Sequence, residues 1–176
     1  GMVVALTGQR RVGKSCVMKR IYEKYSQDSH NNVIYIDMEK TAFADITNYE
    51  NLEAYVAERL DSSKDNYLFI DEVQEIQDFE KAILSLQSDG SCQIMVTGSN
   101  AKMLSSELST RLRGRYIGYH IHGLDYEEFI EFHNLQDNDE SLGMFLQYGG
   151  LPQLRQLGLA NSDLIDDYFE NVVNTI

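Results

Sequence analysis

The chain has 176 residues and a formal net charge of −13, a length that fits one domain, or one domain with part of another, and allows a sizeable core. No apolar run approaches the ~20 residues that a membrane span needs, and no charged-then-apolar leader opens the chain, so we expect neither a membrane protein nor a secreted one. Two cysteines, Cys16 and Cys92, form neither a disulfide framework nor a metal-binding spacing, which predicts two small buried thiols in a reducing, cytoplasmic setting.

The first predicted strand, residues 2–7, is a short uncharged apolar run that leads into a glycine-rich loop. Residues 8–15 read GQRRVGKS and fit G-x-x-x-x-G-K-[ST], the phosphate-binding loop of nucleoside triphosphatases. The glycines let the backbone approach a phosphate, and successive N–H groups form an anion-binding nest. We expect the Lys14 ammonium near the β- and γ-phosphates and the Ser15 hydroxyl on Mg²⁺. The residues expected to bind the phosphates are Gly8, Gln9, Arg10, Arg11, Val12, Gly13, Lys14, Ser15 and Cys16.

The segment after the loop carries apolar residues at helical spacing, from Val17 and Met18 to Tyr25. This pattern predicts a helix that starts at the loop, where its dipole favours a bound phosphate. Residues 33–37 are predicted as a second buried strand, residues 38–47 as a loop and residues 48–60 as a helix.

The second informative stretch is an apolar run, residues 67–70, that ends in Asp71 and Glu72. A buried strand followed by Asp-Glu has the form of the second ATPase signature. Asp71 at the strand tip can orient Mg²⁺, usually through its waters. Glu72 can polarise the attacking water as a general base.

A helix is predicted over residues 78–86, with Asp78 as its N-cap, and a strand over residues 92–97. The strand leads into Gly98, Ser99 and Asn100, which would face the γ-phosphate if this strand lies between the two signature strands. On spacing alone, simple turn chemistry is favoured for these residues.

Residues 101–112 have a helical pattern that ends among three arginines, Arg111, Arg113 and Arg115. One of them could be an arginine finger that stabilises charge on the transferring phosphoryl group. The alternative is a set of surface arginines that pair with the abundant carboxylates.

The last third of the chain is predicted as a strand, residues 116–121, and then helices. Asp125 and Glu128 have the spacing of a capping box for a helix through Phe132. Residues 141–148, 151–157 and 163 to the end are also predicted helical, as a small lid or the start of a next domain. Residues 117–176 hold eleven acidic residues against the single base Arg155, which makes direct nucleic-acid binding by this fragment unfavourable.

Five strands that alternate with helices predict an α/β fold, a parallel sheet with helices on both faces. The assembled motifs resemble the AAA+ superfamily of ATPases. They are most similar to the bacterial and archaeal predicted-ATPase family that carries a C-terminal DUF4143 domain. The matching segments, between about residues 2 and 153, are GQRRVGKS, YLFIDEVQ, VTGSNAKMLSSELS, LRGRY, LDYEEFIEF and YGGLP.

The resemblance implies a five-stranded P-loop NTPase core over residues 2–123 and a helical lid or linker over residues 124–176, towards a C-terminal domain absent here. It implies that the strand bearing Ser99 inserts between the signature strands, with Asn100 or Ser99 as the first sensor. It also implies that Arg115 is the family arginine, with Arg113 and Arg111 as alternates, in its own subunit or in a neighbour's. Where the family usually has Pro-Leu-Ser-Phe, residues 123–126 read Gly-Leu-Asp-Tyr, and aspartate is an equally good N-cap.

The leading functional hypothesis is a module that binds ATP with Mg²⁺ and hydrolyses it. The catalytic residues in this hypothesis are Lys14, Glu72, Asn100 and Arg115. A homo-oligomer is one assembly that we consider for the module. The first alternative is a nucleotide-dependent switch with negligible hydrolysis. The second is a phosphotransferase, although no acceptor-binding signature is present. Work linked to DNA is suggested by family context alone. The absence of an Asn-Lys-x-Asp motif favours adenine over guanine.

Overall fold

A computed structural model describes residues 1–99 and 114–153. The chain divides into two compact units. The first consists of Gly1–Gln9 and Lys14–Ile121, and the second of Arg10–Gly13 and the chain from His122 onward.

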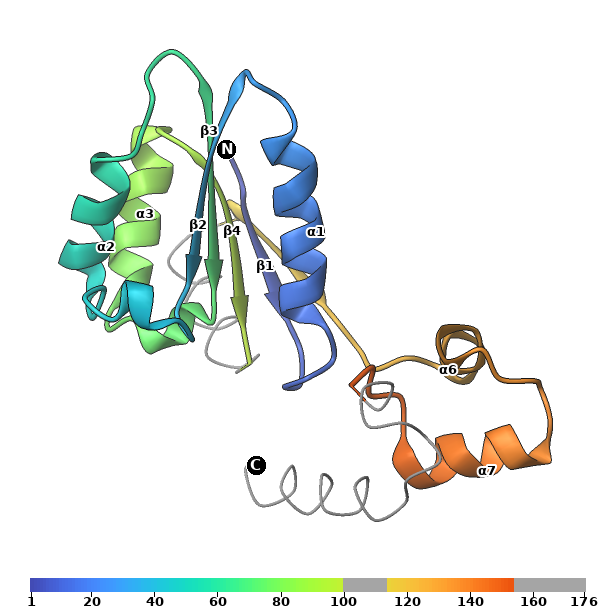
Figure 1. Ribbon diagram of the computed structural model, residues 1–176. Helices are drawn as coiled ribbons and strands as arrows, with labels where there is room; N and C mark the ends of the chain where they lie inside the picture. The colour runs from blue at the N-terminus through green and yellow to red at the C-terminus, as the bar shows by residue number, and fades with distance from the viewer. Residues whose placement is uncertain (100–113, 154–176) are drawn as a thin grey trace. The chain divides into compact units, whose positions relative to one another are not determined.

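The first unit is built on a five-stranded, entirely parallel sheet in the order β2-β3-β4-β1-β5 (Figure 1). This confirms the predicted α/β architecture of the P-loop NTPase type. The strands are β1 (Val3–Thr7), β2 (Asn31–Asp37), β3 (Asp65–Asp71), β4 (Gln93–Gly98) and β5 (Tyr116–His120).

Strand β4 lies between β1 and β3, as the resemblance implied. Thr7 at the end of β1 is in register with Gly98 at the end of β4, and Ile70 of β3 is in register with Val96. Because all strands run the same way, the segments that follow β1, β3 and β4 leave the sheet at one edge. This edge therefore carries the glycine-rich loop, the Asp-Glu pair and Ser99.

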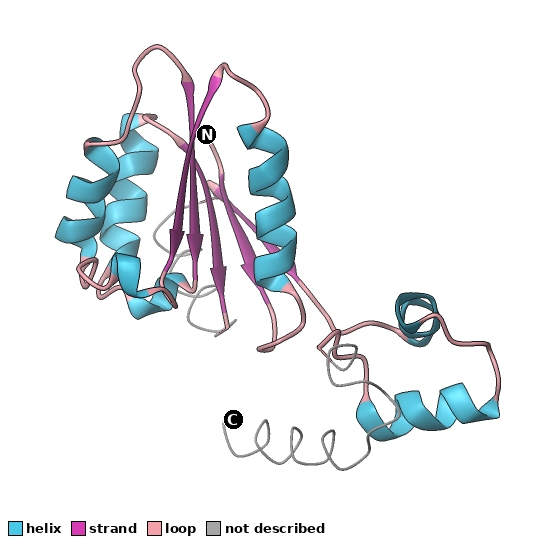
Figure 2. Ribbon diagram, in the orientation of Figure 1, coloured by secondary structure: helices cyan, strands magenta, loops and turns pink. Residues whose placement is uncertain are grey.

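Helices cover both faces of the sheet (Figure 2). Helix α1 (Lys14–Ser26) lies on one face, where Met18 is fully buried against Leu6 and Phe69. Helices α2 (Tyr49–Ala57) and α3 (Phe79–Asp89) lie on the other face, together with the 3-10 turns η1 (Thr41–Phe43) and η2 (Val73–Glu75). They enclose the larger core, which includes Ile36, Leu52, Leu68, Ile70, Ile83 and Val96.

The α2 helix starts where the sequence predicted, because the Asn48 side chain accepts a hydrogen bond from the Asn51 N–H at 2.9 Å. It ends at Ala57, three residues earlier than predicted. Asp78 is the N-cap residue of α3, as predicted, but its side chain makes no capping hydrogen bond. Its backbone is left-handed with φ 55°, and its carboxylate binds Lys81 at 2.9 Å instead of capping α3.

The second unit contains α6 (Tyr126–His133) and α7 (Asp139–Tyr148). The predicted capping box is confirmed, since the Asp125 side chain accepts from the Glu128 N–H and the Glu128 carboxylate accepts from the Asp125 N–H. Phe129 is fully buried and stacks edge-on against Phe145, with ring centroids 5.4 Å apart. The Leu124 N–H donates to the Gly150 carbonyl at 2.7 Å, which ties the start of this segment to its end.

The predicted helices over residues 101–112 and 163–176 and most of the one over 151–157 lie outside the described residues, as do Asn100, Arg111 and Arg113. Within the described ranges, none of the helices has both the length and the apolar character of a membrane span.

Candidate functional site

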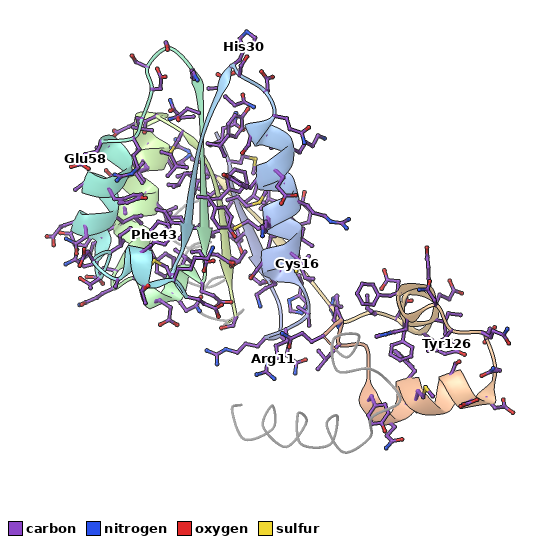
Figure 3. All side chains as sticks on the ribbon, in the orientation of Figure 1. Arg11, Cys16, His30, Phe43, Glu58 and Tyr126 are labelled. Carbon is purple, nitrogen blue, oxygen red and sulfur yellow. The ribbon has the colours of Figure 1, made fainter. Side chains whose placement is uncertain are left out.

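The candidate site lies at the carboxyl edge of the sheet, where the loop after β1 leads into α1 (Figure 1). Figure 3 places Cys16 at this end of α1 and His30 at the opposite edge of the sheet. Cys16 is exposed, so the prediction of a buried thiol is wrong for this residue. Cys92 is buried as predicted, and this burial raises the pKa of its thiol to about 11.

Gly8, the first residue of the loop, has a backbone that only glycine tolerates. Its φ is 144°, and a Cβ added there would lie 2.2 Å from the Ile121 carbonyl oxygen. The loop therefore turns away from β1 in direct contact with the end of β5. This packing gives a physical reason for a glycine at the first position of the motif.

Farther along the loop, Arg11 has φ 71° and Gly13 has φ 101°, so the backbone changes handedness twice within three residues. Such alternation turns successive N–H groups to one side and is the geometry of an anion-binding nest. Val12 between them is buried, whereas Arg10 and Arg11 are exposed.

Lys14 is the first residue of α1, and only 4% of it is exposed. Its ammonium donates to the carbonyl oxygens of Gly8 at 3.1 Å and of Gln9 at 3.0 Å. The loop thus folds around the cation that the motif provides. An ammonium held among carbonyl dipoles at the first residue of a helix is suited to a polyanionic phosphate group.

Asp71 and Ser15 are 56 positions apart in the sequence and lie in contact. The Ser15 hydroxyl donates to Asp71 Oδ1 at 3.1 Å, and the Tyr35 hydroxyl donates to Oδ2 at 3.4 Å. Asp71 is 4% exposed, so this buried carboxylate is held by hydroxyl donors. Hydroxyl and carboxylate oxygens are the hard ligands that Mg²⁺ prefers, so Ser15 and Asp71 fit this ion.

Thr97 of β4 forms hydrogen bonds with both acidic residues at the end of β3, Asp71 and Glu72. Its hydroxyl, fully buried, donates to Asp71 Oδ1 and accepts from the Glu72 N–H at 3.0 Å. Glu72 itself has φ 53°, in the left-handed region, which costs a non-glycine residue roughly 1–2 kcal/mol. Strained backbone of this kind is often found at functional sites, where the surrounding contacts maintain it.

The Glu72 side chain is half-buried, and its Oε2 accepts a hydrogen bond from the Gln74 side-chain amide. The same amide nitrogen lies 3.4 Å from the Ser99 hydroxyl at the end of β4. Glu72 and Ser99, the residues predicted as general base and as a candidate sensor, therefore both lie within hydrogen-bonding distance of the Gln74 amide.

Arg115 does not lie at the end of the sheet that carries the phosphate loop of the same chain. It precedes β5, its carbonyl accepts from the Val3 N–H at 2.8 Å, and its guanidinium donates to Gln87 at 3.4 Å. Val3 begins β1, so Arg115 lies at the amino edge of the sheet, roughly 15 Å from the loop at a rise of about 3.3 Å per residue. Arg115 cannot reach the phosphate loop of its own subunit without a large rearrangement.

Comparison with protein families matches residues 1–130 to the AAA domain. The chain belongs to the AAA domain family. Fold and family together identify a nucleotide-binding module with a P-loop.

The AAA domain also matches two uncharacterized proteins. One, from Haemophilus influenzae, is 29% identical over 160 residues, which is 86% of this chain. The other, from Methanocaldococcus jannaschii, is 27% identical over 183 residues, or 97% of this chain. The chain spans 40% of the length of each of these curated relatives.

Solved structures with the same fold include Cdc6p from Pyrobaculum aerophilum, with a TM-score of 0.55 at 14% identity over 73% of this chain and 41% of that one. AMPPCP-bound DnaA from Aquifex aeolicus has a TM-score of 0.54 at 16% identity, over 96% of this chain and 54% of that one. Domain III of DnaA from Thermotoga maritima has a TM-score of 0.54 at 18% identity, over 88% of this chain and 72% of that one. At these identities the likeness concerns the fold alone.

Local pattern assigns no role to three further residues of the AAA domain's site, Thr97, Gln74 and Tyr35, although Gln74 and Thr97 lie within the matching segments YLFIDEVQ and VTGSNAKMLSSELS. Thr97 and Tyr35 lie within apolar strand patterns, and Gln74 follows the Asp-Glu pair by two positions. Burial and the charges of Asp71 and Asp37 raise the pKa of the Tyr35 hydroxyl, so the phenol stays protonated as a donor to Asp71. Strand order was the missing information, since β4 and β2 flank β3 on its two sides.

Proposed function

We propose that this AAA domain binds ATP with Mg²⁺ and hydrolyses ATP. The observation that carries the proposal is the connected set Ser15–Asp71–Thr97–Glu72, which links the phosphate loop to the backbone N–H of Glu72, the residue expected to act as general base. The set joins three separate parts of the sequence, and a solvated strand end would not need the fully buried Thr97 hydroxyl beside Asp71.

In this proposal, the loop N–H groups and Lys14 bind the phosphates. Lys14 exchanges its bonds to the Gly8 and Gln9 carbonyls for phosphate oxygens. Ser15 and Asp71 would hold Mg²⁺, which would neutralise the negative charge of the phosphates. Glu72 accepts a proton from the attacking water, and Ser99 or Asn100 contacts the γ-phosphate.

We further infer that the chain drives or switches a C-terminal domain of the DUF4143 type in the cytoplasm and that it acts as a homo-oligomer. The resemblance of the motifs supports this inference, as does the 40% share of the relatives' length that the chain spans. Neither a membrane nor nucleic acid is a proposed partner of this fragment.

The experiment that tests the proposal is phosphate release from Mg·ATP by the wild type and by Glu72→Gln. The matched control is Glu75→Gln, which removes an exposed carboxylate three residues away in the same segment. We expect Glu72→Gln to lower the turnover number by about 10²-fold or more, the usual contribution of a general base, while nucleotide affinity stays unchanged. Glu75→Gln should behave as wild type.

Other results would favour the rival functions. Tight nucleotide binding without phosphate release would support a switch. Transfer of the γ-phosphoryl group to a small acceptor, without free phosphate, would support a phosphotransferase. Normal hydrolysis by Glu72→Gln would refute the assignment of Glu72 as the base.

A further inference from the structure

Gln74 occupies a position between the two groups expected to face the γ-phosphate. It lies in η2, two residues after Glu72, and is half-buried. Its side-chain nitrogen donates to Glu72 Oε2 and also lies within hydrogen-bonding range, 3.4 Å, of Ser99 Oγ. One amide group thus connects the end of β3 to the end of β4.

The orientation of this amide follows from the charges around it. A primary amide nitrogen carries two hydrogens, and here it has two acceptors. If the amide were turned over, its oxygen would face the Glu72 carboxylate, and two acceptors would repel each other. The cost of the observed orientation is that Gln74 Oε1 is buried and has no hydrogen-bond partner within the described part of the chain.

The backbone around Gln74 holds it in place. Glu72 is left-handed, and the turn that follows is closed by the Glu75 N–H donating to the Glu72 carbonyl at 3.1 Å. Val73 and Ile76 on either side of Gln74 are buried in the larger core. A buried oxygen without a partner usually costs about 1–3 kcal/mol, and a side chain kept in this orientation despite such a cost suggests a functional constraint.

We propose that Gln74 is a positioning residue that fixes the Glu72 carboxylate and makes its orientation depend on Ser99. This inference rests on the proposed ATP hydrolysis. Because the two acceptors share one amide nitrogen, a movement of the Ser99 hydroxyl toward a γ-phosphate changes the bond that Gln74 makes with Glu72. The general base is then aligned only when a triphosphate occupies the site.

The test compares Gln74→Ala with Gln77→Ala, which truncates an exposed glutamine three residues along the same segment. Turnover number, KM for ATP and affinity for a fluorescent ATP analogue are measured for both variants. For Gln74→Ala we expect the turnover number to fall by about 10- to 100-fold, the effect of a slightly misplaced catalytic group, with KM and affinity within twofold of wild type. Gln77→Ala should match wild type.

A double-mutant cycle with Ser99→Ala tests the link to the sensor. If Gln74 acts between Ser99 and Glu72, the double variant should be no slower than the slower single variant, because residues that act through one connection are not additive. Multiplicative effects of the two substitutions would overturn the proposed link.

Loss of folding is separated from loss of positioning by Gln74→Met, which keeps the length of the side chain and removes its donors. It should lower the turnover number as Gln74→Ala does, at a wild-type melting temperature. A wild-type turnover number in Gln74→Met would overturn the inference. In that case the proposed function would still stand, provided that hydrolysis by the unmodified chain depends on Glu72. A wild type without Glu72-dependent hydrolysis would refute both.

Discussion

The Thr97 hydroxyl donates to the Asp71 carboxylate, and this bond joins two neighbouring strands at the edge where the phosphate loop begins. Thr97 is fully buried and Asp71 nearly so. Since the same hydroxyl accepts the Glu72 N–H at 3.0 Å, Thr97 fixes both acidic residues of the second signature. A valine would fill the same volume but provide neither bond.

Thr97→Val should therefore lower both stability and activity. The substitution leaves the Glu72 N–H without its partner and Asp71 Oδ1 with the Ser15 hydroxyl as its remaining donor, at a cost of about 1–3 kcal/mol in the free energy of unfolding. Urea denaturation and phosphate release measure the two effects. Thr97→Ser keeps the hydroxyl and should restore most of the activity. Wild-type stability and activity in Thr97→Val would show that the two bonds of the hydroxyl contribute nothing to either.

Gly8→Ala should be poorly tolerated, because its Cβ would lie 2.2 Å from the Ile121 carbonyl oxygen at a φ of 144°. We expect a loss of more than about 1 kcal/mol in the free energy of unfolding and a loss of nucleotide binding. Gly143→Ala in α7 is the matched control, since nothing lies within 4 Å of a Cβ there. Removing that helical glycine should increase stability by up to about 1 kcal/mol. Thermal unfolding compares the two variants.

The two cysteines should differ in reactivity. Cys16 is exposed in the first turn of α1, whereas Cys92 is 8% exposed and its burial raises its pKa to about 11. A thiol with that pKa is about 0.1% ionised at pH 8, and the thiolate is the reactive form. Iodoacetamide at pH 8 should modify Cys16 first, as read by peptide mass spectrometry, and Cys92 only after unfolding.

Bound nucleotide should slow that modification of Cys16, because Cys16 directly follows Ser15 in the proposed phosphate site. ADP and Mg·ATP are compared with buffer alone, and Cys16→Ser is the control that removes the fast-reacting thiol. Equal modification of both cysteines in the folded protein would contradict the burial of Cys92. Modification of Cys16 at the same rate with and without nucleotide would argue against a phosphate site at the start of α1.

The sequence was sufficient to predict the sheet, since each strand is a short apolar run bounded by polar turns. It also predicted Lys14, Ser15, Asp71 and Glu72, whose spacing is imposed by the chemistry of a phosphate and a metal ion. The order of the strands could not be predicted in the same way, because no local pattern specifies which parallel strands are neighbours. Only the family resemblance placed the strand that leads to Ser99 between the two signature strands.

Residues that act through a hydrogen bond across the sheet were not predictable from local pattern. Thr97 in an apolar strand looks like any β-branched core residue, and Tyr35 looks like an aromatic strand residue. The helix caps show the same limit. Asp125 caps α6 as its spacing with Glu128 predicted. Asp78 occupies the N-cap position of α3 in a left-handed conformation, and its carboxylate pairs with Lys81 and not with the helix N–H groups.

The position of Arg115 at the amino edge leads to a prediction about assembly. It cannot reach the phosphate loop of its own subunit, so any role as an arginine finger must be played in a neighbouring subunit. Activity per molecule of wild type should then rise with protein concentration. Arg115→Ala should hydrolyse ATP slowly at every concentration and bind nucleotide normally. Arg59→Ala, which removes an exposed arginine stacked on Tyr55, should behave as wild type.

Mixing two inactive variants provides the decisive measurement. Lys14→Ala lacks a working phosphate site but keeps Arg115, and Arg115→Ala has the opposite defect. In a mixed assembly, the arginine of one variant can act on the intact site of the other, so part of the activity should return on mixing. A mixture as inactive as its components, or an Arg115→Ala protein with full activity, would show that Arg115 supplies no charge to the reaction. Its bond to Gln87 would then be its structural role.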